Sequence, residues 1–186
     1  MRQSLTEIAP RLFIGENYLS KQQALATVKN LEEQMGWKDA TVLDYNGGSI
    51  NKDIRRQQLL RNGSEQQIQF ANDVSTWKDL LDINQNVEPY LLEYQVTKIG
   101  GMFGWHPDFY EGSGRVLSCL LYLSDNESHG LEGGETEFMC EEEIITIKPK
   151  IGTVLLFDPK IIHQGTEVTA GIKYSLLVIH GNCPRT

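Results

Sequence analysis

The second half of this 186-residue chain consists of short β-prone runs separated by glycine, proline and acidic residues. Short strands that follow one another at such close spacing are typical of a β-sandwich or a barrel. We expect six strands, near residues 90–98, 115–123, 135–139, 144–148, 152–157 and 172–180. A chain of this length suits one domain with its own hydrophobic core. We therefore expect residues 1–186 to form a single domain.

The first half predicts helices. Ser20 can cap a helix that runs from Lys21 to about Met35, and Gly36 is placed to end it. Residues 66–83 carry apolar side chains at helical spacing, which predicts a second helix.

The segment between these helices is less clear. Residues 40–45 are β-prone and are followed by a turn signal at 46–48, whereas residues 50–61 fit a strand or a helix equally well. The whole pattern predicts an α+β protein that is mainly β: a helical support over about residues 1–89 and a β core over about residues 90–181.

Composition limits the classes of function. The formal net charge is -8, and an acidic chain repels a phosphate backbone, so we do not expect a nucleic-acid partner. Three cysteines without CxxC spacing predict neither a disulfide framework nor a zinc site. The sequence shows no apolar signal core and no run long enough to span a membrane. We expect a cytoplasmic protein without a membrane partner, and the oligomeric state stays open.

Three residues form a candidate metal site. His106 and Asp108 are two positions apart, and residues so spaced on an extended segment point the same way. His163 follows the expected strand at 152–157 and can complete the set from another strand end. Two imidazoles and one carboxylate on one face of an ion form the facial triad of non-heme iron(II) oxygenases. The other histidines have simpler explanations, since His129 lies in a polar turn and His180 lies at a strand end.

Lys173 opens the expected strand at 172–180, ten residues after His163. By alternation it shares a face with Ser175, Leu177 and Ile179. Two interpretations are open. The lysine begins its strand in solvent, or it lies inside the barrel and pairs with a carboxylate ligand, because a buried lysine without a partner is costly.

These residues lie in a series of motifs that resembles the prolyl 4-hydroxylase branch of the 2-oxoglutarate/iron(II) dioxygenases. The resemblance runs from about Tyr90 to Gly181. It is carried by these blocks: Phe103-Gly104-Trp105-His106-Pro107-Asp108, the run from Arg115 to Leu123, Gly133-Gly134-Glu135-Thr136-Glu137-Phe138, the run from Pro149 to Phe157, and His163-Gln164-Gly165 through Lys173. The family implies a double-stranded β-helix, a cupin-like jelly roll with supporting helices.

The resemblance also assigns roles. It implies that His106, Asp108 and His163 bind Fe(II) and that Lys173 binds the distal carboxylate of 2-oxoglutarate. Tyr122 and Thr136 match positions that line the cosubstrate pocket, although a packed tyrosine and a turn threonine are alternatives. Arg115 matches a position near the substrate channel and is otherwise a rim arginine. The family uses O2 and releases succinate and CO2, with ascorbate as a reductant that restores the iron.

Two positions depart from the family pattern. Thr97 stands where the family usually has a tyrosine, nine residues before the first iron histidine, and Phe103 stands where a second tyrosine is common. Tyr94 is three positions from Thr97, so by alternation it faces the other side of its strand. These changes bear on the substrate pocket and leave the metal set intact.

The substrate that we favour is a prolyl residue in a peptide or protein. Trp105 flanks the metal motif and could stack on a proline ring or pack at the barrel mouth, and the acidic chain suits a neutral or basic polypeptide. Three alternatives remain. They are hydroxylation of a free amino acid or small metabolite, a catalytically silent jelly roll that binds a metal or a partner, and a cupin-like metal isomerase.

Overall fold

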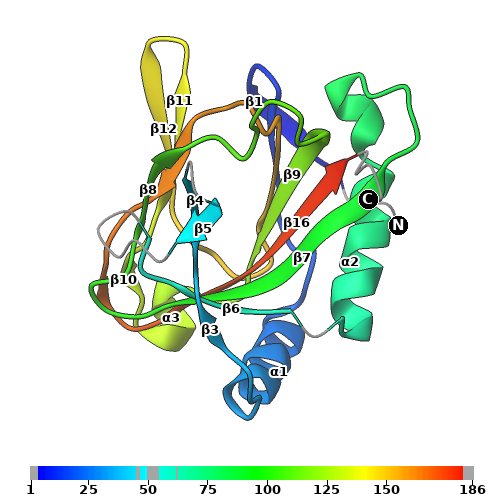
Figure 1. Ribbon diagram of the computed structural model, residues 1–186. Helices are drawn as coiled ribbons and strands as arrows, with labels where there is room; N and C mark the ends of the chain where they lie inside the picture. The colour runs from blue at the N-terminus through cyan, green and yellow to red at the C-terminus, as the bar shows by residue number, and fades with distance from the viewer. Residues whose placement is uncertain (1–3, 45–46, 50–54, 62, 182–186) are drawn as a thin grey trace.

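The computed structural model describes residues 4–44, 47–49, 55–61 and 63–181, with the side chains of 42–44 and 47–49 outside this description. Two sheets face each other across the molecule (Figure 1). The larger has eight strands in the order β1-β2-β13-β9-β16-β7-β6-β3, and the smaller has four in the order β12-β11-β14-β8. This arrangement is the expected double-stranded β-helix.

The bounds of the strands follow. The larger sheet contains β1 (Thr6–Ala9), β2 (Leu12–Gly15), β3 (Lys38–Asp39), β6 (Gln58–Leu60), β7 (Glu88–Thr97), β9 (Arg115–Tyr122), β13 (Val154–Phe157) and β16 (Lys173–Gly181). The smaller sheet contains β8 (Phe103–His106), β11 (Thr136–Cys140), β12 (Glu143–Ile147) and β14 (His163–Gly165). Two further pairs are β4 (Val42–Asp44) with β5 (Gly47–Ser49), and β10 (Glu132–Gly133) with β15 (Val168–Ala170).

Helices α1 (Lys21–Glu32) and α2 (Glu65–Ser75) cover the outer face of the larger sheet (Figure 1). Each begins with a capping box, in which Ser20 or Ser64 accepts from the backbone three residues on. A 3-10 turn, η1 (Lys78–Leu81), follows α2, and the short α3 spans Asn126–His129. None of these described helices is long and apolar enough to cross a membrane.

Strand alternation divides the larger sheet into two faces. On β16, Tyr174, Leu176 and Val178 pack under the helices, whereas Lys173, Ser175, Leu177 and Ile179 face the smaller sheet. The inner face is apolar on β9 and β13 but polar on β7. The inward residues of β9 and β13 include Leu120, Tyr122, Leu155 and Phe157, and those of β7 are Leu91 followed by the polar Glu93, Gln95 and Thr97. The polar half of this face borders the functional site.

All six predicted strands are present, each to within a few residues. Helix α1 ends at Glu32 rather than near Met35, because its buried side chains end at Leu31 and Met35 is almost fully exposed. The second predicted helix is divided into α2 and η1.

The first 89 residues hold strands as well as helices. Strands β1 and β2 extend the larger sheet, and both were too short to show a period in the sequence. Within the ambiguous 50–61 segment, residues 58–60 form β6, and residues 50–54 lie outside the described residues. The predicted strand at 40–45 corresponds to β4. Of the predicted turn, Gly47 and Gly48 belong to β5, and Asn46 lies outside the described residues.

Candidate metal centre and cosubstrate pocket

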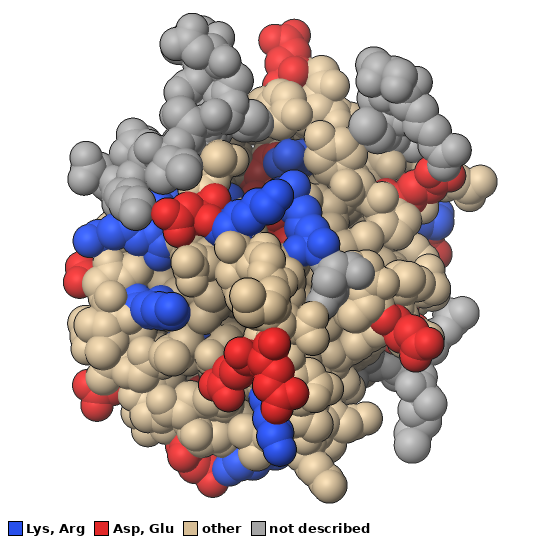
Figure 2. Space-filling view, turned by 60° about the horizontal axis from the view of Figure 1, so that its bottom comes forward, with Lys and Arg blue, Asp and Glu red and all other residues tan. Residues whose placement is uncertain are grey.

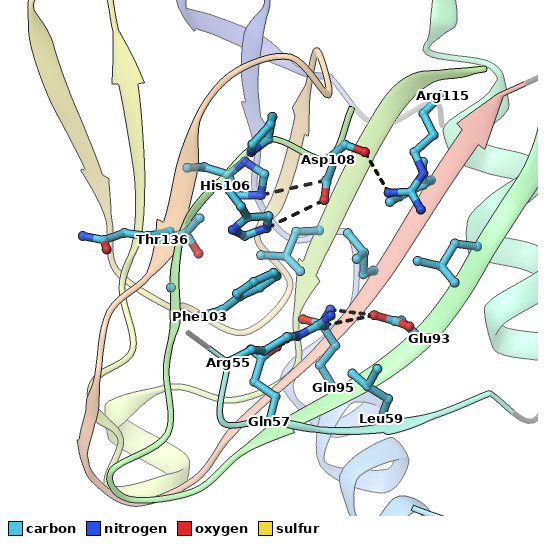
Figure 3. A pocket seen from close by; sticks show the side chains of 18 of the residues that line it. Arg55, Gln57, Leu59, Glu93, Gln95, Phe103, His106, Asp108, Arg115 and Thr136 are labelled. Carbon is cyan, nitrogen blue, oxygen red and sulfur yellow. Dashed lines mark hydrogen bonds and ion pairs between the residues drawn. The ribbon is translucent and has the colours of Figure 1, made fainter. Parts of the chain in front are cut away.

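The smaller sheet brings the candidate metal ligands together. Strands β8 and β14 are antiparallel neighbours, and His106 pairs directly with His163. Asp108 follows β8 by two residues and turns its carboxylate toward both rings. Its oxygens lie 3.8 Å from Nε2 of His106 and 3.9 Å from Nε2 of His163 (Figure 3). One possible ligand atom from each residue lies within 4.8 Å of the others, which is compact enough for a single ion.

The backbone sets the orientation of both imidazoles. Nδ1 of His106 lies 2.8 Å from the carbonyl of Gly104, and Nδ1 of His163 lies 2.9 Å from the carbonyl of Ile161. A carbonyl only accepts, so each Nδ1 carries a proton and each Nε2 is the ring nitrogen turned toward Asp108. Burial lowers the pKa of His106 to about 3, and the neighbouring His163 adds to this effect. His106 is therefore neutral, the form that binds a metal.

The carboxylate of Asp108 is held in the ionised form. Burial opposes ionisation, but His163, His106 and the hydroxyl of Ser118 together keep the pKa of Asp108 below its ordinary value. Ser118 donates to Oδ2 at 2.7 Å, and Arg115 donates to the backbone carbonyl of Asp108 at 2.7 Å. Two imidazoles that turn Nε2 toward the site and one oriented carboxylate fit the donor set that iron(II) takes in facial-triad sites.

Lys173 lies in the same cavity, at its buried end. This lysine is 5% exposed, so it lies inside the barrel and does not begin its strand in solvent. Its Nζ donates to the carbonyl of Gly134 at 2.6 Å, and burial lowers its pKa to about 8. Nζ also lies 5.4 Å from the ring centre of Tyr122, whose hydroxyl donates to Thr136 at 2.6 Å. Lys173 and Thr136 line the cavity, whereas Tyr122 is fully buried beside them and is not among the described lining residues, so its contact with a cosubstrate stays a prediction.

The wall opposite the metal residues is charged. Phe103 stacks on His106 with ring centres 3.5 Å apart, and the guanidinium of Arg55 lies 4.3 Å from the centre of the same Phe103 ring. Figure 3 shows these three side chains as a column. Glu93 is 1% exposed and accepts from Arg55 at 3.3 Å and from Arg61 at 2.9 Å.

The remaining predicted site residues have the following places. Arg115 lines the cavity and lies over the rings of Tyr90 and Tyr110. Trp105 is 40% exposed and is not among the described residues that line the cavity, so its contact with a substrate stays a prediction. His129 is half-buried in α3 rather than exposed, because its ring lies beside Tyr174. His180 is fully buried, as its position at a strand end predicted.

The two departures from the family pattern lie on different strands, Thr97 on β7 and Phe103 on β8 beside His106. Thr97 is buried and accepts from the side-chain amide of Gln57 at 3.1 Å. Tyr94 faces α2, where its hydroxyl bonds to Gln66, so the prediction from alternation is confirmed. Phe103 has no hydroxyl for the cosubstrate, and its ring instead carries the guanidinium of Arg55.

Three comparisons with known proteins bear on this site. The family model described as "2OG-Fe(II) oxygenase superfamily" matches residues 91–179. Residues 91–179 belong to this superfamily. The matched region includes the three candidate metal ligands, Lys173, Tyr122 and Thr136, so the oxygenase region holds the whole constellation.

Individual relatives extend the comparison beyond the oxygenase region. Prolyl 4-hydroxylase 2 of Arabidopsis thaliana is 26% identical over 204 residues, which cover 89% of this chain and 65% of that protein. Prolyl 4-hydroxylase 1 of the same plant is 37% identical over 84 residues, 34% of this chain and 28% of that protein. This chain therefore spans less than two thirds of the length of either relative.

A solved structure supports the fold. The prolyl hydroxylase of Trichoplax adhaerens, in complex with a hypoxia inducible factor oxygen degradation domain peptide fragment, matches with a TM-score of 0.74 at 18% identity. The match covers 92% of this chain and 84% of that one. It shows that the double-stranded β-helix extends over almost the whole chain, including the part before the oxygenase region.

Sequence reasoning missed the charged wall. Arg55, Gln57 and Arg61 precede the oxygenase region and belong to no motif. A usable signal did exist on β7, where Glu93, Gln95 and Thr97 alternate with Tyr94 and Val96. A strand with polar residues on one face and apolar residues on the other, inside a barrel, indicates a buried charge that needs a partner.

Proposed function

We propose that this chain is a hydroxylase that uses Fe(II), 2-oxoglutarate and O2 and acts on a prolyl residue of a peptide or protein. One observation carries the proposal. The two Nε2 atoms and the carboxylate of Asp108 converge in a cavity of about 1120 Å³ that also contains the buried ammonium of Lys173. A metal set and a separate carboxylate receptor in one cavity are what a metal-dependent enzyme with a dicarboxylate cosubstrate requires.

The side chains divide the work by chemistry. His106, His163 and Asp108 would hold the iron, which supplies the activation of O2 that protein side chains cannot provide. Lys173 would bind the distal carboxylate of 2-oxoglutarate through a charge-assisted hydrogen bond, with the hydroxyls of Tyr122 and Thr136 beside it.

Aromatic packing encloses the metal residues. Phe138 and Phe157 contact the ring of His163, with ring centres 5.7 Å and 4.9 Å away. These rings fix the imidazole and keep water from that side of the site. Fe(II), 2-oxoglutarate and O2 are thus the expected reactants, with succinate and CO2 as coproducts and ascorbate as a reductant.

The prolyl target rests on different support. Both curated relatives are named prolyl 4-hydroxylases. The cavity slightly exceeds the usual range for small-molecule sites, so it has room for a substrate beside the cosubstrate. A second candidate, the hydroxylation of a free amino acid, is favoured by the arginines of the opposite wall, which could bind an α-carboxylate. The intact metal set with Lys173 argues against a catalytically silent module.

The test measures succinate formed from 2-oxoglutarate under air with added Fe(II), with proline-containing peptides compared with free L-proline. We expect peptide-stimulated succinate together with one hydroxyproline for each succinate. His163→Ala should abolish both products, whereas His129→Ala, a histidine outside the metal set, should retain them. Succinate without hydroxyproline, or stimulation by free L-proline alone, would contradict the prolyl-peptide proposal.

A further inference from the structure

The cavity carries a net positive charge that the metal and the cosubstrate do not use. Asp108 belongs to the metal set, and Lys173 to the proposed cosubstrate site. The other charged side chains that line the cavity, among the described residues, are Arg55, Arg61, Arg115 and Glu93. Three positive charges against one negative charge leave an excess of two, in a chain whose formal net charge is -8. Figure 2 shows Lys and Arg side chains gathered beside the hollow on this face.

Arg55 is fixed close to the reaction centre. Its guanidinium and the ring of His106 lie over the same Phe103 ring, so the column places the arginine one ring away from a metal ligand. Arg55 also interacts electrostatically with Asp108. Its Nε donates to Gln57 at 3.0 Å and its Nη2 to Glu93 at 3.3 Å. The charge is therefore oriented before any substrate arrives.

Arg115 approaches the centre from the other side. Its Nη1 donates to the carbonyl of Asp108, and the rings of Tyr90 and Tyr110 lie about its guanidinium, with centres 5.0 Å and 5.1 Å from Cζ. Its Nε is buried and has no hydrogen-bond partner among the described residues. A buried donor of a charged group without an acceptor is costly, so this position calls for an anionic acceptor.

Arg61 completes the set. It is 61% exposed at its side chain and shares Glu93 with Arg55, so one carboxylate serves two guanidinium groups. If these arginines served only to hold the wall together, we would expect an equal number of carboxylates beside them. The excess instead creates a positive field, which low-dielectric walls concentrate within the cavity.

We propose that the substrate presents a carboxylate beside the carbon that is hydroxylated, and that Arg115 and Arg55, with Arg61 at the rim, receive it. The proposal rests on the proposed function and names its substrate class. The carboxylate could be an aspartate or glutamate side chain next to the target residue, or the α-carboxylate of a chain end or an amino acid. The positive charge of the cavity thus favours an anionic substrate, whereas the acidic composition of the whole chain favours a neutral or basic one.

The test compares substrates that differ only in charge. Three amidated peptides of equal length carry one proline followed by Asp, Asn or Lys. A fourth peptide has the Asn sequence but ends in a free carboxylate next to the proline. Free L-proline is the fifth substrate. We expect kcat/KM for the Asp peptide to exceed that for the Asn peptide by about 10- to 100-fold, as for one charge-assisted hydrogen bond. The Lys peptide should be the poorest substrate, and added salt should reduce the preference.

Substitution of the arginines tests which of them cause the preference for a carboxylate. The ratio of Asp to Asn peptide within each variant cancels any general loss of activity. We expect Arg115→Gln and Arg61→Gln to bring this ratio toward one. Arg56→Gln is the matched control, because Arg56 is an exposed neighbour that does not line the cavity, and it should keep the ratio of the unmodified protein.

Each outcome has one meaning. A preference for the Asp peptide supports a side-chain carboxylate, and a preference confined to the free terminus or to L-proline supports an α-carboxylate. Equal use of the Asp peptide, the amidated Asn peptide and the peptide with the free terminus, a preference for Lys, or a carboxylate preference unchanged in Arg115→Gln overturns the inference. If no substrate yields succinate, the proposed function fails instead. Equilibrium binding of the same peptides to the Mn(II)-loaded protein then tests the carboxylate preference without turnover.

Discussion

The two walls of the cavity differ in how they are assembled. The metal wall, formed by His106, Asp108 and His163, takes these candidate ligands from β8, β14 and the residues just after β8, and two of the three lie within three residues of sequence. The opposite wall draws Arg55 and Arg61 from one segment and Glu93 from a strand more than thirty residues later, joined by ion pairs. A metal needs a fixed geometry of few donors, whereas a substrate surface can be built from many combinations of side chains.

The walls also differ in charge. The metal wall presents two imidazoles and one carboxylate, and the opposite wall presents guanidinium groups in excess of carboxylates. The walls should therefore respond separately to mutation, the first in metal affinity and the second in stability and substrate choice.

The largest effect is expected from removal of a metal ligand. His163→Ala leaves one imidazole and one carboxylate, and we expect the affinity for Fe(II) or Co(II) to fall by at least about 100-fold, beyond the usual effect of a supporting residue. Titration with Co(II), followed by its absorption, measures the change. His129→Ala should bind as the unmodified protein does. An unchanged affinity in His163→Ala would remove His163 from the metal set.

The next largest effect is expected in the opposite wall and should leave the metal wall unchanged. Glu93→Gln leaves the buried guanidinium of Arg55 without its counter-charge, and we expect the free energy of unfolding to fall by about 3 kcal/mol. Urea denaturation measures this loss, and Glu142→Gln, on an exposed turn, is the control. Co(II) affinity should change little. A large loss of metal affinity at native-like stability would show that the two walls are not independent.

The buried ammonium of Lys173 should favour the binding of 2-oxoglutarate and lower the stability of the folded protein. Lys173→Met should weaken 2-oxoglutarate binding by about 10- to 100-fold, the range of a charge-assisted hydrogen bond. Calorimetry with the Mn(II)-loaded protein measures it, and Lys29→Met on the outer helix is the control. Since the pKa of Lys173 is about 8, affinity should be constant below pH 8 and fall as pH rises above it. Lys173→Arg should abolish that fall; persistence of the fall would contradict the assignment.

The same pKa fixes the sign of a stability change. Lys173 has a pKa of about 8 in the folded protein against 10.5 ordinarily, so the unfolded chain binds more protons between these values. The free energy of unfolding should rise with pH across this window, by about 3 kcal/mol. Lys173→Met should lack this rise and be more stable than the unmodified protein at pH 7.

The smallest effect concerns a supporting hydroxyl. Ser118→Ala removes the hydrogen bond to Oδ2 of Asp108, and we expect Co(II) affinity to fall by about tenfold. Ser20→Ala is a useful contrast, because loss of the helix cap should lower stability by about 1 kcal/mol and leave metal affinity unchanged. Equal metal affinity in both variants would show that Ser118 does not orient the carboxylate.

The difference between the two walls also explains which features could be predicted from the sequence. His106, Asp108, His163 and Lys173 were predicted as site residues from their spacing and from the resemblance to a known family, and the structure gathers them in one cavity. The six strands of the second half were found because strand alternation acts over short distances. Strands β1 and β2 were not, since four residues show no period. The partners of Glu93 were not found either, because their pairing depends on where a distant segment crosses the barrel.

The segment from Arg55 to Leu60 touches both sheets. Arg55 pairs with Phe103 at the start of β8, and β6 pairs with β7 three residues later. This short stretch bridges the gap between the sheets, and none of its residues belongs to the candidate metal set. Its cavity-facing side chains can therefore vary while the candidate metal ligands stay the same, provided that the buried charge of Glu93 keeps a partner. Grafting this stretch from one relative to another offers a way to exchange substrate preference while the iron site is inherited unchanged.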